Sequence, residues 1–236
     1  MIDGLELPPD PSILEVGCGT GGNLAMLSRF GTLSAMELDD SARRMATDRG
    51  VVEVQAGRLP DQIPSDGPFD LIVALDVIEH VADDVAAVNA LRSRLTPRGR
   101  LLVTVPAFMF LWSEHDEINH HFRRYRRAGL TDVLVRSGLS VDHMTYFNTA
   151  LFPLVAIPRL VERMRPPTPE ASGGELVVPG RTVNRVLESV FAAERKPASR
   201  FRLPFGVSLL AVGQQAEVVS AQAGDRSTPT SGHSHQ

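Results

Sequence analysis

The chain has 236 residues, 43% of them apolar, with 24 Lys and Arg against 28 Asp and Glu. This length suits one main domain, and the balance of charge excludes the overall basic field that drives non-specific binding to nucleic acid. Cys18 is the only cysteine, which excludes an internal disulfide and a cysteine-based zinc site and fits a reducing compartment. Residues 1–11 lack the features of a secretory signal, and the longest apolar stretch, 150–157, is far shorter than the roughly 20 residues that cross a bilayer. We therefore expect a cytoplasmic protein with no transmembrane segment, although peripheral contact with a membrane stays open.

Short apolar runs alternate with helix-like segments through the first two thirds of the chain. This pattern is typical of crossover units that build a parallel sheet. The run 69–75 is almost unbroken, as in a central strand that is buried on both faces. We expect a Rossmann-like, mostly parallel seven-stranded α/β sheet with helices on both faces. Its strands should cover 13–16, 33–38, 51–54, 69–75, 100–105, 139–147 and 207–212, with helices over 22–29, from Asp40, over 83–95 and over 130–136.

The pattern changes after residue 106. The segment 107–127 holds the only Trp, three His and a cluster of four Arg, a composition that suits a loop over a site. An apolar stretch with two prolines follows at 149–164, then a linker rich in Pro and Gly at 166–180, and then an amphipathic helix around 183–191. We predict a core over 1–147 with an acceptor lid at 107–128, a helical insertion or pocket wall over 148–204, a last core strand within 205–216 and a disordered tail over 217–236.

Four glycines, Gly17, Gly19, Gly21 and Gly22, lie between the first expected strand and helix. Without side chains they permit positive φ and let backbone amides approach a ligand at a helix N-terminus. Their spacing also fits the dinucleotide pattern G-x-G-x-x-G, so the glycines alone do not distinguish a nicotinamide cofactor from another nucleotide-type ligand. A strand-to-helix turn that merely needs glycine is the alternative without function.

Two acidic residues narrow the choice of ligand. Glu15 lies inside an apolar strand, where an unpaired carboxylate is costly to bury, so it requires a donor or a cation nearby. Such an acid suits the ammonium group of a cofactor that carries an amino acid, and it would repel a pyrophosphate. Glu37 lies 20 residues after Gly17, the distance at which an acid accepts hydrogen bonds from a ribose diol. Asp39 is the alternative for that role.

Three segments together resemble the class I S-adenosylmethionine-dependent methyltransferases: ILEVGCGTG at 13–21, FDLIVALDVIEH at 69–80 and LTPRGRLLVTVP at 95–106. The resemblance covers roughly residues 10–147 and the last strand. It implies S-adenosylmethionine as the cofactor, S-adenosylhomocysteine as its product, and a small-molecule acceptor. The family often has an acid where Arg58 stands, which leaves the contact to the adenine amino group unassigned. The implied cofactor-binding residues are Glu15, Gly17, Gly19, Gly21, Glu37, Leu38, Arg58, Leu59, Leu75 and Asp76.

The segment 107–127 holds the candidates for acid–base chemistry. Methyl transfer depends mainly on proximity, and a general base helps when the acceptor is a hydroxyl, an acidic carbon or a protonated amine. His115, His120 and Tyr125 are our candidates for that base. The Arg cluster favours an anionic acceptor such as a phosphate or carboxylate. The alternative is a solvated lid whose arginines pair with the neighbouring acids Glu114, Asp116 and Glu117.

Asp76, Glu79 and His80 fall at i, i+3 and i+4, so a helical turn would place them on one side. Ubiquinone-type O-methyltransferases resemble this stretch, and their acid-x-x-Glu-His turn can bind a divalent metal. We predict no metal here and keep these three residues as a weak possibility, because one turn does not fix a coordination geometry. In the alternative, His80 packs at a helix start that the acids cap.

Several readings stay open. The stretch 149–195 departs from the family pattern and could be a pocket wall for a lipid-like acceptor, a homodimer interface, a membrane-surface patch or simple packing against the sheet. O-, N- and C-methylation are equally compatible with the sequence. A nicotinamide-dependent oxidoreductase is disfavoured by Glu15 and by the lack of a second dinucleotide half. A cofactor-binding module without turnover is the third possibility.

Overall fold

A single seven-stranded sheet organises the protein. The computed structural model describes residues 1–64, 67–164, 193–194 and 201–216. Within them the strand order is β3-β2-β1-β4-β5-β7-β6, and only β7 runs antiparallel to its neighbours. This confirms the predicted Rossmann-like, mostly parallel sheet. The strands are β1 (Ser12–Val16), β2 (Thr32–Glu37), β3 (Val54–Ala56), β4 (Phe69–Leu75), β5 (Leu95–Pro106), β6 (Leu139–Phe147) and β7 (Ser208–Gln215).

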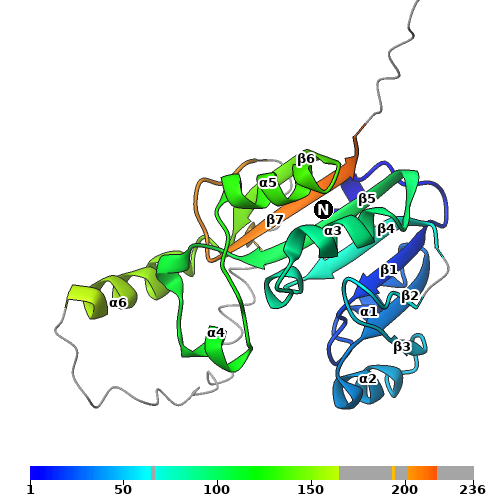
Figure 1. Cartoon of the computed structure of the whole chain (residues 1–236), viewed down its shortest axis with the longest axis horizontal. Coiled ribbons are helices and arrows are strands. Elements are labelled where there is room, and N and C mark those ends of the chain that lie inside the picture. Colours follow the sequence, from blue (N-terminus) through cyan, green and yellow to red (C-terminus); the bar gives the residue numbers. More distant parts are fainter. Residues whose placement is uncertain (65–66, 165–192, 195–200, 217–236) are drawn as a thin grey trace, which may run out of the picture.

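Helices cover one face of the sheet and pack their apolar stripes on it. Figure 1 shows α3 (Asp84–Arg92) and α5 (Arg127–Arg136) side by side over β4, β5 and β7. Their side chains Val88, Leu91, Leu130 and Leu134 are fully buried in the largest apolar cluster. Removing such side chains from water is worth about 1.5–3 kcal/mol each. The helices are therefore held on the sheet chiefly by this burial.

The other face of the sheet is covered by the start of the chain and by α1 (Leu24–Leu27). Ile13 of β1 and Leu71 of β4 are fully buried there with Leu27 of α1. Ile2 and Leu5, close to the 3-10 turn η1 (Ile2–Gly4), pack against this cluster and are partly buried. The helix α2 (Asp40–Thr47) lies at the β3 end of the sheet (Figure 1).

Some predicted boundaries were wrong. The third strand begins at Val54, because Val51 and Val52 precede the ladder and pack against α2 and β2 instead. The fifth strand begins at Leu95, five residues early, since Leu95 pairs with Phe69 and the ladder resumes at Leu71 and Arg100 after an irregularity. Pro97 and Gly99 lie within this irregularity, which accommodates both.

The two prolines of the stretch 149–164 do not interrupt it. Instead, α6 runs from Phe152 to Met164. Pro153 lies in its first turn, where a backbone N–H makes no hydrogen bond within the helix, so the missing N–H of proline costs nothing there. Pro158 lies inside the helix. Figure 1 shows α6 projecting from the end of the sheet, and Leu154, Ile157 and Leu160 are exposed on it. The predicted linker at 166–180, amphipathic helix at 183–191 and tail beyond 217 lie outside the described residues.

None of the described helices combines the length and the apolar character that crossing a membrane requires.

Candidate functional site

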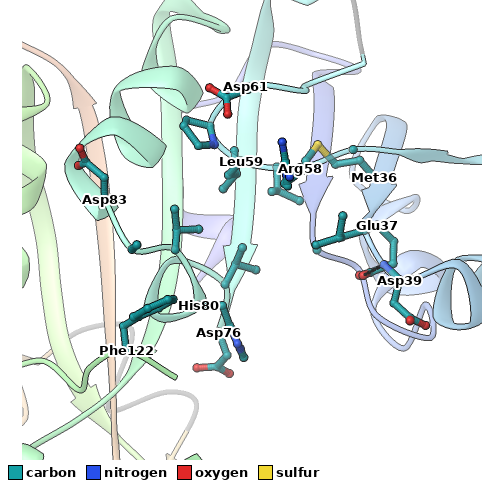
Figure 2. Close-up of a pocket in the computed structure, with 18 of the residues that line it drawn as sticks. Met36, Glu37, Asp39, Arg58, Leu59, Asp61, Asp76, His80, Asp83 and Phe122 are labelled. Atoms are coloured by element: carbon teal, nitrogen blue, oxygen red, sulfur yellow. Dashed lines mark hydrogen bonds between the residues drawn. The ribbon is translucent and has the colours of Figure 1, made fainter. Parts of the chain in front are cut away.

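A cavity of about 1180 Å³ opens at the carboxyl ends of β1, β2 and β4 (Figure 2). β1 pairs with β2 on one side and with β4 on the other, so the chain leaves β1 in one direction and later returns on its opposite side. Open parallel sheets bind ligands at such a switch point. Of the predicted cofactor residues, those that line this cavity are Gly17, Glu37, Leu38, Arg58, Leu59 and Asp76.

The loop after β1 requires glycine at specific positions. Gly17 has φ +65°, and a Cβ there would lie 2.7 Å from Cγ2 of Val77 on the loop after β4. Gly21 has φ +79° and packs against Ala46 of α2, where a Cβ would lie 3.0 Å from the backbone. At both positions the left-handed conformation and the close approach exclude a side chain. The loop can therefore lie close against Val77 and α2, which leaves the cavity open.

Glu37 connects the glycine loop to the second strand. Its Oε2 accepts a hydrogen bond from the backbone N–H of Gly19 at 2.7 Å, and its Oε1 accepts one from Asp39 at 2.9 Å. A carboxylate has about four acceptor positions, so two remain for a diol in the cavity. Asp39, the alternative for this role, is engaged as the N-cap of α2 and accepts from the N–H of Ala42 at 2.7 Å.

Glu15 is a buried acid without a full set of partners. It is 1% exposed, its Oε1 accepts from the side-chain amide of Asn23 at 3.3 Å, and its Oε2 has no hydrogen-bond partner within the described part of the chain. Burial raises the pKa of Glu15 to about 7, an effect that the bond from Asn23 partly offsets. An orphaned buried oxygen at the end of β1 is well suited to a cation such as the ammonium group of a cofactor.

Further lining residues follow β2, β3 and β4. Leu38, next to Glu37, is 62% exposed. Arg58, Leu59 and Asp61 follow β3 (Figure 2). Asp76, after β4, has φ +52°, a strained conformation that Asp tolerates better than most residues, and its N–H donates to the carbonyl of Thr104. Leu75 faces the other side of the sheet, where it lines a second cavity of about 280 Å³.

Ion pairs and hydrogen bonds fasten the segment 107–127 to the rest of the protein. The N–H of Phe122 donates to the carbonyl of Glu79 at 2.9 Å, next to the 3-10 turn η2 (Ile78–His80). Arg123 lies 2.8 Å from Oδ2 of Asp84 on α3, and the hydroxyl of Tyr125 donates to the same oxygen. Burial and the charge of Asp84 raise the pKa of Tyr125, which is 5% exposed and does not line the cavity.

Asp116 is the centre of the polar network inside this segment. It follows the start of the helix α4 (Glu114–Ile118) and is fully buried. Arg124 donates to both of its oxygens at 2.8 Å, Ser113 N donates at 2.8 Å, and Nδ1 of His121 lies 2.8 Å from Oδ1. Burial alone would raise the pKa of Asp116, but the bonds from Arg124, His121 and Ser113 outweigh it and hold the pKa at about 2.

The structure thus separates the three predicted catalytic residues from the cavity. His115 and His120 are exposed on the segment and Tyr125 is buried beneath it, and none of the three lines the cavity. Of the histidines in this segment, His121 is the one that points toward the turn after β4. Its signal in the sequence is weak, because its partner Asp116 lies five residues earlier, which matches no regular helical or strand spacing.

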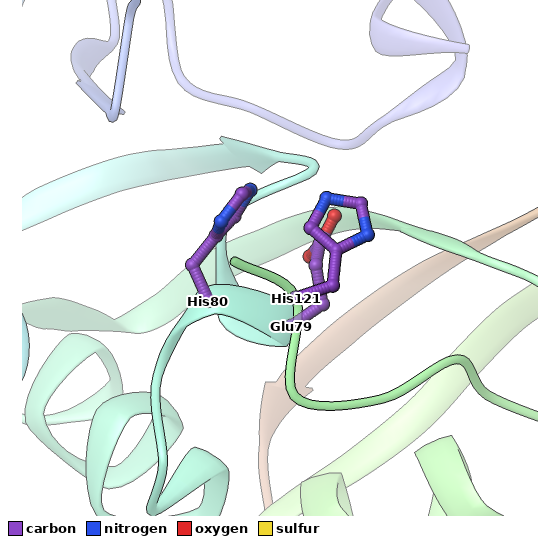
Figure 3. Close-up of side chains that lie close together, drawn as sticks. All are labelled: Glu79, His80 and His121. Carbon is purple, nitrogen blue, oxygen red and sulfur yellow. The ribbon is translucent and has the colours of Figure 1, made fainter. Parts of the chain in front are cut away.

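Glu79 and His80 of η2 meet His121 at the edge of the cavity (Figure 3). One nitrogen of each imidazole and one oxygen of Glu79 lie within 4.8 Å of one another, and the two rings stand edge to face with centroids 4.5 Å apart. Glu79 is fully buried, and no residue that the structure describes forms a hydrogen bond to either of its carboxylate oxygens. Burial, and then the charge of Asp76, raise the pKa of Glu79 to about 8. Asp76 is not a member of this group.

Comparison with known sequences identifies a family over most of the described core. The family described as the methyltransferase domain matches residues 4–144, more than half of the chain. A ubiquinone biosynthesis O-methyltransferase of Xylella fastidiosa (strain 9a5c) is 33% identical over 109 residues, which cover 41% of this chain and 44% of that protein. The chain spans less than half the length of the first curated relatives it matches, at 42% and 44%.

Solved structures show the same fold at low identity. An S-adenosylmethionine-dependent methyltransferase of Mesorhizobium loti aligns with a TM-score of 0.57 at 15% identity, covering 89% of this chain and 94% of that one. Phosphoethanolamine N-methyltransferase 2 of Haemonchus contortus, in complex with S-adenosyl-L-methionine, aligns with a TM-score of 0.55 at 14% identity, covering 87% and 49%. At these identities the likeness concerns the fold alone.

We expect Glu15→Gln to stabilise the ligand-free protein at alkaline pH. The folded pKa of about 7 lies above the ordinary 4.5, so the stability that the protonated carboxyl confers below pH 4.5 is lost as pH rises through about 7. The free energy of unfolding, measured with urea, should therefore fall with pH in the wild type relative to Glu15→Gln. Between pH 4.5 and about 7 the difference between the two proteins should change by about 1.4 kcal/mol per pH unit, roughly 3 kcal/mol in all. For the exposed control Glu53→Gln, the free energy of unfolding should differ from that of the wild type by the same amount at every pH. The same result for Glu15→Gln would contradict the conclusion that Glu15 is a buried acid without a full set of partners.

We expect Arg124→Ala to destabilise the protein by about 3–5 kcal/mol, because it leaves the buried carboxylate of Asp116 without its main counter-charge. Arg126→Ala, at an exposed position two residues away, is the matched control and should change the free energy of unfolding by less than about 0.5 kcal/mol. Urea unfolding at pH 7 measures both. Equal small effects of the two substitutions would show that the Asp116 network does not hold this segment.

Proposed function

The chain belongs to the class I S-adenosylmethionine-dependent methyltransferases, and on that premise we propose that it methylates a small neutral or cationic molecule that enters between the turn after β4 and the segment 107–128. The chain is an enzyme of this family and its cofactor is S-adenosylmethionine. The acceptor and the role of 107–128 as an acceptor lid are our proposal. The observation that carries it is that one cavity of about 1180 Å³ is lined by Glu37 as well as by His80 and Phe122.

The size of the cavity supports two ligands. Pockets that hold one small molecule measure roughly 300–1,000 Å³, and this one measures about 1180 Å³. Glu37 and Asp39 line one end, and His80 and Phe122 line the other (Figure 2). A cofactor at the first end leaves the second end for an acceptor, which is the arrangement that in-line transfer between two bound molecules requires.

The residues of the chain would bind and orient both partners. S-adenosylmethionine supplies an electrophilic methyl group on a sulfonium when it is bound. Glu37 would accept the ribose hydroxyls, and the orphaned oxygen of Glu15 would accept the ammonium of the methionine end. Leu38 and Leu59 offer apolar surface to the adenine, and Arg58 stands where an acid is common in the family. These roles follow from the contacts that each side chain leaves open.

The charges at the acceptor end support a neutral or cationic acceptor rather than the anionic one that the sequence suggested. Arg123 is paired with Asp84, and Arg124 with Asp116, so two of the four clustered arginines already have counter-charges. Asp76 and Asp83 line the cavity instead. Carboxylates repel an anion and attract a cation or a hydroxyl donor. The relatives named above include an O-methyltransferase and an N-methyltransferase, and both acceptor atoms are compatible with this wall.

We expect Glu37→Ala to weaken binding of S-adenosylhomocysteine by about 10- to 100-fold, because two charge-assisted hydrogen bonds to the ribose are lost. Isothermal titration calorimetry measures the affinity, and Glu53→Ala, at an exposed position outside the cavity, should bind as the wild type does. Thermal-shift assays with NAD should give no stabilisation. Unchanged affinity in Glu37→Ala would refute the ribose assignment, and stabilisation by NAD alone would refute the proposed function.

A further inference from the structure

We propose that Glu79, His80 and His121 form a binding site for a zinc-class divalent metal ion, in which the segment 107–128 supplies the third ligand. The resemblance had pointed to Asp76, Glu79 and His80 on a single turn. The structure brings His121 to this turn from 41 residues further along the chain, and Asp76 stays outside the group. The inference goes beyond the proposed function, because binding of the ion needs neither cofactor nor acceptor.

The three donor atoms converge closely enough for one ion. They lie within 4.8 Å of one another. Ligand atoms about 2.0–2.2 Å from a tetrahedral zinc ion lie roughly 3.4 Å apart, so modest side-chain rotations would close the site. Figure 3 shows the two imidazoles standing side by side with Glu79 beside His121. The N–H of Phe122, next to His121, donates to the carbonyl of Glu79, and this backbone bond holds the two parts of the site together.

Glu79 is the observation that calls for a ligand. Its side chain is fully buried, and neither carboxylate oxygen has a hydrogen-bond partner among the described residues. Buried polar groups in native proteins almost always have a partner, and an acid at such a position is costly to retain without one. A cation held jointly with two imidazoles would satisfy both the charge and the lone pairs of Glu79.

His121 is held as metal-binding histidines usually are. Ring nitrogens that bind a metal almost always leave the other nitrogen to donate to a carboxylate or carbonyl, which fixes the tautomer and the orientation of the ring. Nδ1 of His121 lies 2.8 Å from Oδ1 of Asp116, and Asp116 is itself fixed by Arg124 and Ser113. Since the carboxylate only accepts, Nδ1 carries the proton and Nε2 keeps its lone pair for a ligand.

The donor set selects the kind of ion and its consequence. Two imidazoles and one carboxylate suit zinc, cobalt or iron, whereas magnesium and calcium prefer oxygen ligands alone. Three protein ligands leave a fourth position open. His80 lines the cavity, so the ion would lie at its wall, next to the proposed acceptor end. It would also join the segment 107–128 to the turn after β4.

The test is metal binding by the full-length, untagged chain after chelator treatment, with Co²⁺ as an optical probe and Zn²⁺ in calorimetry. His233 and His235 near the end of the chain are replaced by Gln in every sample, so that they add no imidazole. We expect one ion per chain. Glu79→Gln and His121→Gln should each weaken binding by more than about 100-fold, and Asp116→Asn by about 10- to 100-fold through the loss of orientation.

Two variants are the controls. His115→Gln removes an exposed histidine of the same segment, and Asp76→Asn removes the acid that the resemblance favoured, and both should bind the ion as the unmodified sites do. Circular dichroism and urea unfolding, measured on each variant without metal, show whether the fold is intact. The proposal is overturned if Zn²⁺ and Co²⁺ do not bind, or if His121→Gln keeps full affinity in a folded protein. Loss of binding in Asp76→Asn alone would overturn it in favour of the single turn. Failure of S-adenosylhomocysteine to bind would count against the proposed function only.

Discussion

Parallel pairing of β1 with both β2 and β4 is the constraint on which the site depends. Parallel strands end at the same edge of the sheet, so the strand pairing alone brings the loops after β1, β2, β3 and β4 together there. The glycine loop can pass under Val77 only because Gly17 has no side chain, and this close approach leaves the cavity open. Burial of the two sheet faces fixes the strands, and the loops inherit their positions from them.

Two buried acids, Glu15 and Glu79, lower the stability of the ligand-free fold, because an unpaired buried carboxylate is costly. In the described ranges, Glu15 and Glu79 each keep at least one carboxylate oxygen without a hydrogen-bond partner, and burial raises the pKa of both. In a core selected for stability alone, such groups would be replaced or paired. Glu15 lies beneath the proposed cofactor end and Glu79 at the proposed acceptor end. Both exceptions therefore lie where a charged ligand can supply the missing partner.

The segment 107–127 uses its charges within the protein. Arg124, Asp116 and His121 form one buried chain of interactions, and Arg123 and Tyr125 both contact Asp84 on α3. A run of four arginines looks like an anion site in the sequence. In the structure, the two that have carboxylate partners position the segment, and their positive charge is neutralised before any acceptor approaches. What the segment presents to the turn after β4 is the imidazole of His121.

Local sequence determined the sheet and the glycine loop and singled out Glu15 and Glu37 as candidate ligands of the cofactor, because strand periodicity, glycine spacing and an acid inside an apolar strand are each properties of neighbouring residues. It also identified the family, through three segments that lie on β1, β4 and β5 and, for the first two, on the loop that follows. It missed the ends of β3 and β5 and the continuous helix α6, since ladder irregularities and first-turn prolines depend on the partner strand or helix. Only the tertiary structure could place His121 beside Glu79 and His80, and His115, His120 and Tyr125 outside the lining of the cavity. That pairing joins residues 41 positions apart through backbone and carboxylate contacts that no spacing in the sequence encodes.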